Sequence, residues 1–455
     1  MKRLGLYLSI CLVLVTACGQ ATPTLPPTQP PTQTAIPSPT PEPGPTVAPT
    51  AVPGVLYVDP AQDLGPISPY IFGANHGIGA SISLEMLPTA LDSGITALRW
   101  PGGAWGDDYD MKGFQVDQFL AFCDQMGALP TISVRLDGGT PEAAAELVRY
   151  ANIQKKYGLV YWSIGNEPTL YEADLGETYD TVRFNKEWRD IAEAMKAVDP
   201  SIKLMGPELH QWGTNLQTTL KDSSGRDWMT EFLKANGDLV DVVTVHRYPL
   251  GNTESIDELR QNTPEWTGLV VYLRSLIAEI TGRDLPIAFT EVNSTPRSLM
   301  GGDATPDSFY NAIWYADVLG RLVQQRVFMV NYWILGKNSG LGLFYNSEVR
   351  PTFYVFKMYQ QFGSQLVFAS SGIEDVTVYA AKRPDGTLTI LVINLSDVEQ
   401  QTPLQINGLA SGKAEVWLFD AAHQAENLGQ QDLPADGTLA LPPQSITLLA
   451  IGSSQ

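Results

Sequence analysis

Between residues 67 and 364, short apolar runs alternate with segments in which apolar residues recur every three or four positions. The first pattern is typical of strands buried on both faces, and the second is typical of helices with one apolar face. The predicted strands are 67–76, 95–101, 130–136, 159–164, 202–207, 240–248, 285–293 and 327–335. The predicted helices are 82–91, 116–126, one that begins at 140–142, 184–198, 228–235, 266–280, 309–322 and 352–362. Eight such alternations predict an α/β fold, a (β/α)8 TIM barrel over residues 67–364.

Beyond residue 363 the apolar positions recur every second residue. This period, with a Pro-Asp-Gly turn at 384–386, predicts a β-hairpin, and further strands follow at 414–419 and 445–451. We therefore predict a small all-β sandwich over residues 365–455. A short strand within 54–66 precedes the barrel, and we expect it to join the sandwich because it otherwise has no sheet.

Residues 1–18 have the features of a bacterial lipoprotein signal peptide. A charged start is followed by a short apolar segment, and Val15-Thr16-Ala17-Cys18 resembles a lipobox. Residues 19–53 are rich in Pro and Thr, a composition typical of an extended linker. We expect an extracytoplasmic protein that is lipid-anchored to the bacterial cell membrane through Cys18. An ordinary cleavage site after Ala17 is the alternative.

Charge and cysteine content narrow the classes of partner. The formal net charge of the 455-residue chain is −20, which opposes attraction to nucleic acid. Of the three cysteines, Cys11 lies in the predicted signal peptide, Cys18 is the predicted anchor, and Cys123 lies among apolar positions at helical spacing. No Cys/His spacing is typical of a metal site, so we predict neither metal nor cofactor.

Two predicted strands each deliver a glutamate at the carboxyl end. Glu167 follows the fourth strand, in Gly-Asn-Glu-Pro, and Glu291 ends the seventh. Catalytic residues of β/α-barrels lie at this end. Hydrolysis of a glycosidic bond with retention needs two carboxyl groups ~5–5.5 Å apart, one to protonate the leaving oxygen and one to attack the anomeric carbon. A surface acid that caps a helix is the alternative for Glu167 alone, but the pair of glutamates predicts a glycosidase.

The segments around these glutamates resemble clan A glycoside hydrolases, whose acid/base and nucleophile follow strands four and seven. This resemblance implies that Glu167 is the acid/base, that Glu291 is the nucleophile, and that Asn166 bonds the sugar 2-hydroxyl. Residues 98–103, Leu-Arg-Trp-Pro-Gly-Gly, resemble the second-strand motif of α-L-arabinofuranosidases. A buried Arg99 can bond the nucleophile and keep its pKa low; pairing with a structural acid is the alternative.

Shorter pieces resemble glycoside hydrolase family 79, the β-glucuronidase and heparanase group. Residues 164–171 resemble its Gly-Asn-Glu-Pro-Asp-Leu-Tyr pattern, with Thr169 in place of the acid, and residues 291–314, which include Asn293, resemble its Glu-Thr-Asn-Ser…Gly-Gly pattern. The resemblance implies β-glucuronidase-like specificity. A uronic acid needs a local cation beside an ionised glutamate, and Lys337, after strand eight, is our first candidate. A solvated surface lysine is the alternative.

The remaining candidates for contact with the sugar are Asn75, His76, Trp100, His246, Tyr248, Asn293 and Trp333. His246 and Tyr248 are two positions apart on the sixth strand, so their side chains point to the same face. By the clan A resemblance, the tyrosine bonds the nucleophile. Trp100 and Trp333 offer indole faces on which the C–H faces of sugars pack. For His76 and Trp100, packing in the core is the alternative.

The prediction from the sequence is an extracytoplasmic retaining glycoside hydrolase that acts on a polysaccharide or oligosaccharide by double displacement. Its expected specificity is β-glucuronidase-like, with α-L-arabinofuranosidase or another clan A β-glycosidase as the alternative. An alternative from another class is a sugar-binding lipoprotein of an importer. That protein would have two α/β lobes joined by hinge strands, without glutamates at the ends of strands four and seven. The oligomeric state does not follow from the sequence.

Overall fold

The structure is a computed structural model that describes residues 52–77, 82–213, 220–251, 255–336, 339–409, 412–434 and 436–452. All of them belong to the unit Glu42–Gln455. The predicted signal peptide with Cys18, most of the predicted linker, and Lys337 lie outside the described residues. In the described part of the chain, no helix is both long and apolar enough to cross a membrane.

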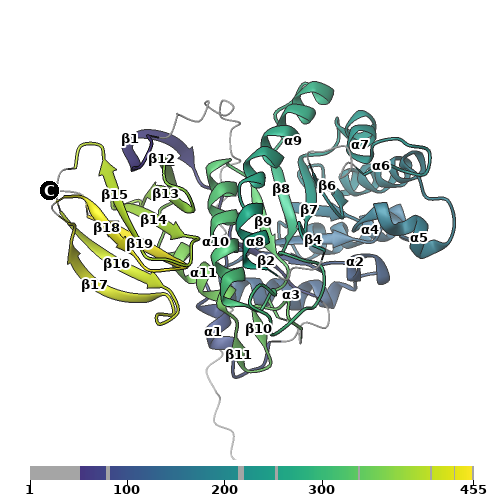
Figure 1. Ribbon diagram of the computed structural model, residues 1–455. Coiled ribbons are helices and arrows are strands. Elements are labelled where there is room, and N and C mark those ends of the chain that lie inside the picture. Colours follow the sequence, from purple (N-terminus) through teal and green to yellow (C-terminus); the bar gives the residue numbers. More distant parts are fainter. Residues whose placement is uncertain are drawn as a thin grey trace, which may run out of the picture. The chain divides into compact units, whose positions relative to one another are not determined.

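Eight parallel strands close into a barrel that is surrounded by helices (Figure 1). They are β2 (Gly73–Asn75), β3 (Ala97–Trp100), β4 (Leu129–Val134), β5 (Tyr161–Ile164), β6 (Lys203–Leu209), β7 (Val242–Arg247), β8 (Ile287–Val292) and β9 (Met329–Tyr332). Gly73 of β2 pairs with Ala97 on one side and with Asn331 on the other, which closes the ring. The predicted barrel is confirmed, and its fourth and seventh strands are β5 and β8.

The helices follow the strands in the expected alternation. They are α1 (Leu87–Leu91), α2 (Trp105–Asp108), α3 (Gly113–Met126), α4 (Pro141–Val148), α5 (Tyr171–Leu175), α6 (Thr181–Val198), α7 (Trp228–Asn236), α8 (Ile256–Asn262), α9 (Glu265–Thr281), α10 (Phe309–Gln324) and α11 (Pro351–Gln360). A π-helical turn, η1 (Arg149–Gln154), extends α4, and a 3-10 turn, η2 (Pro168–Leu170), precedes α5.

Caps and apolar spacing explain where these helices begin. Thr140 accepts a hydrogen bond from the backbone N–H of Ala143, and proline occupies the first turn of α4. The predicted helix at 82–91 is shorter than expected, because Pro88 lies in the first turn of α1 and cannot donate a backbone hydrogen bond within a longer helix.

The strands outside the barrel form the C-terminal β-sandwich region. They are β1 (Leu56–Pro66), β12 (Gln365–Ser371), β13 (Val376–Lys382), β14 (Leu388–Asn394), β15 (Gln400–Ile406), β16 (Lys413–Phe419), β17 (Glu426–Asp432), β18 (Thr438–Leu441) and β19 (Ser445–Ile451), and two short strands, β10 (Phe344–Tyr345) and β11 (Glu348–Val349), pair separately. β1 lies between β12 and β15. Leu404 of β15 and Val416 of β16, far apart in the strand order, share one apolar cluster, so the sheet folds over a common core.

Helix α10 connects the barrel to this sheet through polar contacts as well as packing. Asp317, which is fully buried, forms an ion pair with Arg321 at 2.8 Å. Its other oxygen accepts hydrogen bonds from the hydroxyls of Thr377 at 2.6 Å and Tyr379 at 2.5 Å, both on β13. A Cβ atom at Gly320 would lie 2.2 Å from the Tyr379 ring, so glycine is needed for this close approach.

Candidate active site

The two predicted glutamates lie at one end of the barrel. Glu167 follows β5 with a left-handed backbone (φ 51°), and its N–H donates to the carbonyl oxygen of Glu208 at 2.9 Å. Glu291 lies in β8 and is 3% exposed. The pairing of β7 with β8 shifts by one residue between Val245 and His246, so that His246 pairs with Glu291. This bulge brings the imidazole beside the carboxylate.

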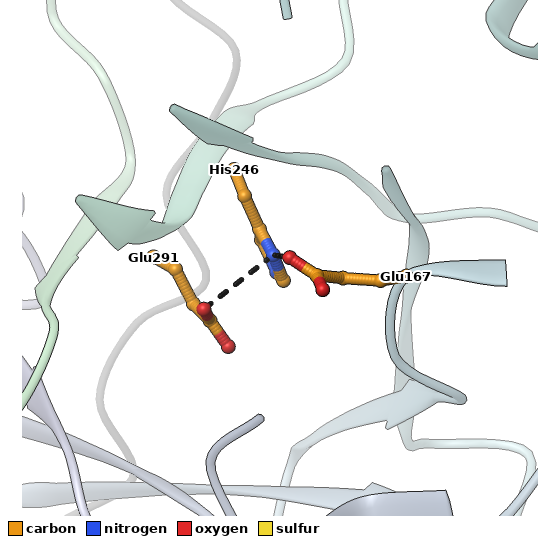
Figure 2. Close-up of side chains that lie close together, drawn as sticks. All are labelled: Glu167, His246 and Glu291. Atoms are coloured by element: carbon orange, nitrogen blue, oxygen red, sulfur yellow. Dashed lines mark hydrogen bonds and ion pairs between the residues drawn. The ribbon is translucent and has the colours of Figure 1, made fainter. Parts of the chain in front are cut away.

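His246 lies between the two glutamates (Figure 2). Its Nδ1 is 2.8 Å from Oε1 of Glu167 and 3.7 Å from Oε2 of Glu291. One carboxylate oxygen of each glutamate and the imidazole nitrogen all lie within 4.8 Å of one another. The structure therefore brings together the two carboxylates that the sequence predicted, with the predicted histidine as their neighbour.

Arg99 holds three of the predicted residues in place from β3. Its Nη1 donates to Oδ1 of Asn75 at 3.0 Å and to Oε1 of Glu291 at 2.9 Å, while Nη2 donates to Oδ1 of Asn166 at 2.9 Å. The guanidinium is fully buried, so this fork of charge-assisted hydrogen bonds is screened little by water. The hydroxyl of Tyr248 donates to Oε2 of Glu291 at 2.5 Å. Both oxygens of Glu291 thus have a donor.

The charged side chains of this cluster shift one another's pKa. Burial raises the pKa of Glu291 and Glu167 adds to the rise, whereas His246, Arg99 and Tyr248 lower it; the balance is a raised pKa. Burial also raises the pKa of Glu167, but the hydrogen bond and charge of His246 outweigh it and the pKa is lowered. Burial lowers the pKa of His246, yet the surrounding carboxylates raise it to about 9. Glu167 and His246 therefore titrate as a pair that is joined by one hydrogen bond.

Glu208, a third buried carboxylate, is missing from the prediction. It lies at a bulge of β6 with φ 57°, and its side chain is fully buried. Its Oε2 is 3.1 Å from Nε2 of His246 and 3.5 Å from Nη2 of Arg99, and its Oε1 accepts from the Ser163 hydroxyl at 2.6 Å. The Thr290 hydroxyl also donates to it. Burial raises the pKa of Glu208, but Arg99 and His246 lower it to about 2. A glutamate after Gly-Pro inside an apolar strand is the sequence signal that could have indicated it.

Asp107, on α2, is another buried acid that was not predicted from the sequence. Its carboxylate accepts from the backbone N–H of Leu136 at 2.8 Å, Asp137 at 3.2 Å and Asn166 at 2.8 Å, and from the Tyr171 hydroxyl. Burial raises its pKa to about 6 against these hydrogen bonds. Asp107 thereby ties the loops after β4 and β5 together and fixes the backbone next to Glu167.

The rings of His76 and Trp100 lie against helix α3, which favours the alternative that they pack in the core, and their contact with the sugar stays a prediction. Both follow residues that point into the barrel, Asn75 and Arg99, and neighbours on a strand point to opposite faces. The Trp100 ring stacks on Phe119 of α3 at 5.3 Å, and the His76 ring is 5.1 Å from that of Phe122. Burial lowers the pKa of His76 to about 4, so it packs as a neutral ring.

Trp333 and Asn293 lie on the loops after β9 and β8. Nδ2 of Asn293 donates to the Trp333 carbonyl oxygen at 2.6 Å. The indole of Trp333 lies 6.3 Å from that of Trp105, and a Cβ atom at Gly103 would lie 2.4 Å from the Trp333 ring. The second glycine of the Pro-Gly-Gly segment is therefore required by the approach of an aromatic ring to the backbone.

The cluster can be explained without a metal ion. The ligand atoms of Glu167, His246 and Glu291 are close enough together to surround a cation. Each of these residues already has an ionic or hydrogen-bonding partner in the cluster, and Arg99 supplies positive charge. The geometry therefore gives no reason to assign a metal.

Two family models match parts of the chain. Residues 145–338, which include both glutamates, match the family model described as glycosyl hydrolases family 39. Residues 374–447 match the C-terminal immunoglobulin-like domain of D-apionate lactonase. The matched part of the barrel is therefore similar to glycoside hydrolases. The matches support the clan A resemblance, and closeness to family 79 stays a prediction.

Several curated relatives carry glycosidase names. An intracellular exo-α-L-arabinofuranosidase of Bacteroides ovatus is 22% identical in an alignment of 405 positions that covers 70% of this chain and 73% of the relative. Alpha-L-arabinofuranosidase C of Emericella nidulans is 31% identical in an alignment of 130 positions that covers 24% of this chain. Endoglucanase A of Paenibacillus lautus is 26% identical in an alignment of 337 positions that covers 60% of this chain. The matches span only 25% of the Emericella enzyme and 45% of the Paenibacillus enzyme.

Solved structures of glycosidases share the fold over most of the chain. An arabinofuranosidase superposes with a TM-score of 0.71 and 19% identity over 87% of this chain and 99% of its own. The α-L-arabinofuranosidase of Thermotoga maritima, solved as an arabinose complex, gives a TM-score of 0.70 and 20% identity over 87% and 99%. At these identities the likeness shows the fold.

Proposed function

We propose that this protein is a retaining glycoside hydrolase with Glu291 as nucleophile and Glu167 as acid/base. The observation that carries the proposal is the short distance between the two carboxylates, which have oxygens within 4.8 Å of each other across the end of the barrel. Retaining enzymes hold the two carboxyl groups ~5–5.5 Å apart, whereas inverting enzymes separate them by ~6.5–9.5 Å to admit a water molecule.

The environments of the two glutamates suit different roles. Glu291 is nearly fully buried, and its oxygens are oriented by Arg99 and Tyr248. It attacks the anomeric carbon while the bond to the leaving oxygen breaks, and Glu167 gives its proton to that oxygen. In the second step Glu167 takes a proton from water, which attacks the anomeric carbon and releases Glu291. The side chain of Glu167 is 23% exposed and so is more accessible than that of Glu291. This suits an acid/base, because that group must reach both the leaving group and the attacking water.

Asn166 is suited to hold a sugar hydroxyl. Its Oδ1 accepts from Arg99, so its Nδ2 is the group that can donate to a ligand. Its backbone is fixed by Asp107, which keeps the side chain next to Glu167. This geometry supports the 2-hydroxyl contact that the clan A resemblance implies.

For the sugar, we put an α-L-arabinofuranoside first. Matched relatives in Bacteroides and Emericella are named for that activity, and the second-strand motif with Arg99 resembles that of α-L-arabinofuranosidases. A β-glucuronide is the second candidate, on the family 79 resemblance around both glutamates. The other candidate substrate is a β-glucan, because a matched Paenibacillus relative is an endoglucanase.

A panel of substrates tests the proposal. It contains nitrophenyl α-L-arabinofuranoside, β-glucuronide and β-glucoside, together with arabinan, glucuronoxylan, glycosaminoglycan fragments and cello-oligosaccharides. Proton NMR of the first-formed product from the best substrate should show the anomeric configuration of that substrate. An inverted product, or no hydrolysis of any member of the panel, would contradict the proposed function.

Substitution of Lys337 tests the β-glucuronide against the neutral arabinofuranoside as the substrate. If the site takes a β-glucuronide, Lys337→Met should weaken its hydrolysis far more than that of the neutral β-glucoside, because only the uronate loses a charge partner. Arg297, in the loop after Glu291, is the second candidate for this charge partner, and Arg297→Met is tested in the same way. Equal losses on both substrates would remove the uronic-acid specificity and leave the arabinofuranoside.

We also propose that the enzyme works outside the cytoplasm, anchored through a lipid on Cys18. The proposal rests on the lipobox-like Val15-Thr16-Ala17-Cys18 and on the Pro/Thr-rich segment that follows. Cys18→Ser should release the protein to the soluble fraction or leave the precursor uncleaved. Unchanged processing and membrane retention in that variant would argue against the anchor.

A further inference from the structure

The mechanism above does not use Glu208, although this glutamate is at the centre of the charged cluster. Its carboxylate is fully buried and has four side-chain partners, the hydroxyls of Ser163 and Thr290, the imidazole of His246 and the guanidinium of Arg99. Burying a third carboxylate beside two glutamates costs free energy unless its hydrogen bonds and ion pairs compensate. Such a group calls for an explanation other than packing.

We propose that Glu208 is a positioning residue that holds the proton of His246 on Nε2 and thereby directs Nδ1 at the acid/base Glu167. The inference rests on the proposed function for its catalytic meaning, but its geometric part stands on the contacts of Glu208 alone.

Hydrogen-bond chemistry fixes the position of this proton. An ionised carboxylate only accepts, so the contact of 3.1 Å between Glu208 and Nε2 needs N–H on the histidine side. Glu208 stays ionised because Arg99 and His246 outweigh the effect of burial and lower its pKa to about 2. Nδ1, on the other side of the ring, is then free either to accept from a protonated Glu167 or, when protonated itself, to donate to the carboxylate at 2.8 Å.

His246 and Glu167 can therefore share one proton without any movement of the ring. When Nδ1 carries it, the hydrogen bond stabilises ionised Glu167, the form left after the leaving group has been protonated. When Glu167 carries it, one N–H bond has broken, one O–H bond has formed, and the charge of the pair is unchanged. In the other neutral tautomer, Nδ1 carries the proton and Nε2 has none. The Glu208 carboxylate would then face the lone pair of Nε2, and Nδ1 could not accept a hydrogen bond from Glu167.

The groups facing His246 come from several barrel elements. Glu167 follows β5, Glu208 lies on β6, and Glu291 lies on β8. His210, after β6, repels a charged His246 and is itself partly buried. Among the described residues, Glu208 is the carboxylate that hydrogen-bonds Nε2, so it sets the tautomer while the other two glutamates act on Nδ1.

Histidine NMR on the full-length protein tests this directly, because the chain has only four histidines. Nitrogen-15 spectra distinguish imidazolium and the two neutral tautomers, and His246→Asn assigns the signals. In the wild-type protein Nε2 of His246 should be protonated at every pH, including above its titration. A neutral His246 with the proton on Nδ1 would overturn the proposal, even if the protein hydrolyses glycosides normally.

Glu208→Gln keeps the shape of the side chain and removes its charge. The titration midpoint of His246 should fall by about one pH unit or more, because an opposite charge in direct contact is lost. The pH dependence of kcat should shift with it, while KM changes less. Glu208→Asp, which keeps the charge, should restore part of the His246 shift and serves where the glutamine variant does not fold.

Asp317→Asn is the matched control, since it removes another fully buried carboxylate with an arginine and two hydroxyl partners. It should leave both the His246 titration and the pH profile unchanged. If Glu208→Gln leaves the His246 titration unchanged as well, Glu208 is structural and the inference fails, whereas absence of glycosidase activity in wild-type protein would instead refute the proposed function.

Discussion

The chain buries two clusters of ionised side chains, and they differ in how their charges balance. The cluster on α10 has one carboxylate, Asp317, against one cation, Arg321. One Asp317 oxygen pairs with Arg321, and the other accepts from the hydroxyls of Thr377 and Tyr379 on β13. The cluster in the barrel has three carboxylates, Glu167, Glu208 and Glu291, against Arg99 and His246.

The difference separates a structural role from a chemical one. Asp317 is fully buried, and both of its oxygens have partners within the protein, so it has no free face toward a ligand. In the barrel, one carboxylate is 23% exposed and shares a hydrogen bond with an imidazole whose pKa is about 9. The barrel cluster has more carboxylates than cations, and Glu167 shares a proton with His246. Because Glu167 is also partly exposed, it can pass a proton to a ligand.

The largest expected effect is on turnover in the barrel cluster. Glu291→Gln should lower kcat by several orders of magnitude on the preferred glycoside, because the nucleophile is lost while the shape of the side chain stays. Steady-state kinetics with a nitrophenyl glycoside measure it. Activity equal to that of the wild type would remove Glu291 from the mechanism.

A smaller and selective effect is expected at the other glutamate. Glu167→Ala should nearly abolish hydrolysis of substrates with poor leaving groups and spare those with good ones, since good leaving groups need little protonation. A series of aryl glycosides of rising leaving-group pKa gives the comparison. Equal losses along the series would contradict the role of Glu167 as acid.

In the α10 cluster, we expect an effect on stability and none on chemistry. Asp317→Asn leaves Arg321 without its partner and should lower the free energy of unfolding by about 3 kcal/mol. Urea unfolding measures the loss, and kcat of the folded protein should stay at the wild-type value. A variant with normal stability and reduced kcat would break the distinction between the clusters.

The smallest effect is a pH dependence of stability from His246. Its folded pKa of about 9 lies above its ordinary value of 6.5, so its stabilisation is complete below pH 6.5 and is lost as the pH rises through 9. The denaturant midpoint should therefore fall over this range, and fall less in His246→Gln. The same slope in both proteins would show that His246 is not the group responsible.

The barrel could be predicted because its strands are buried on both faces and read as continuous apolar runs. Strands β15 and β17 were not predicted, because Gln400–Ile406 and Glu426–Asp432 are largely polar and partly exposed. Their pairing is decided by neighbours distant in the sequence. Short helices such as α2 and α5 have too few residues to show a periodic pattern.

For the site, the two glutamates and their immediate partners were predictable from the ends of strands. The outward direction of Trp100 also follows from alternation with Arg99, whose side chain points into the barrel. Glu208 was harder, because it lies at a bulge where the simple two-residue period fails. Its contact with His246 depends on the barrel closing.

Covalent trapping tests the central claim most directly. The protein should be incubated with the 2-deoxy-2-fluoro glycosyl fluoride of its preferred sugar, and its intact mass and peptide map recorded. We predict a mass increase of one fluoroglycosyl group, located on Glu291 and absent in Glu291→Gln. Attachment to another residue, or steady turnover of the preferred glycoside without any trapped adduct, would contradict Glu291 as the nucleophile of a retaining glycosidase.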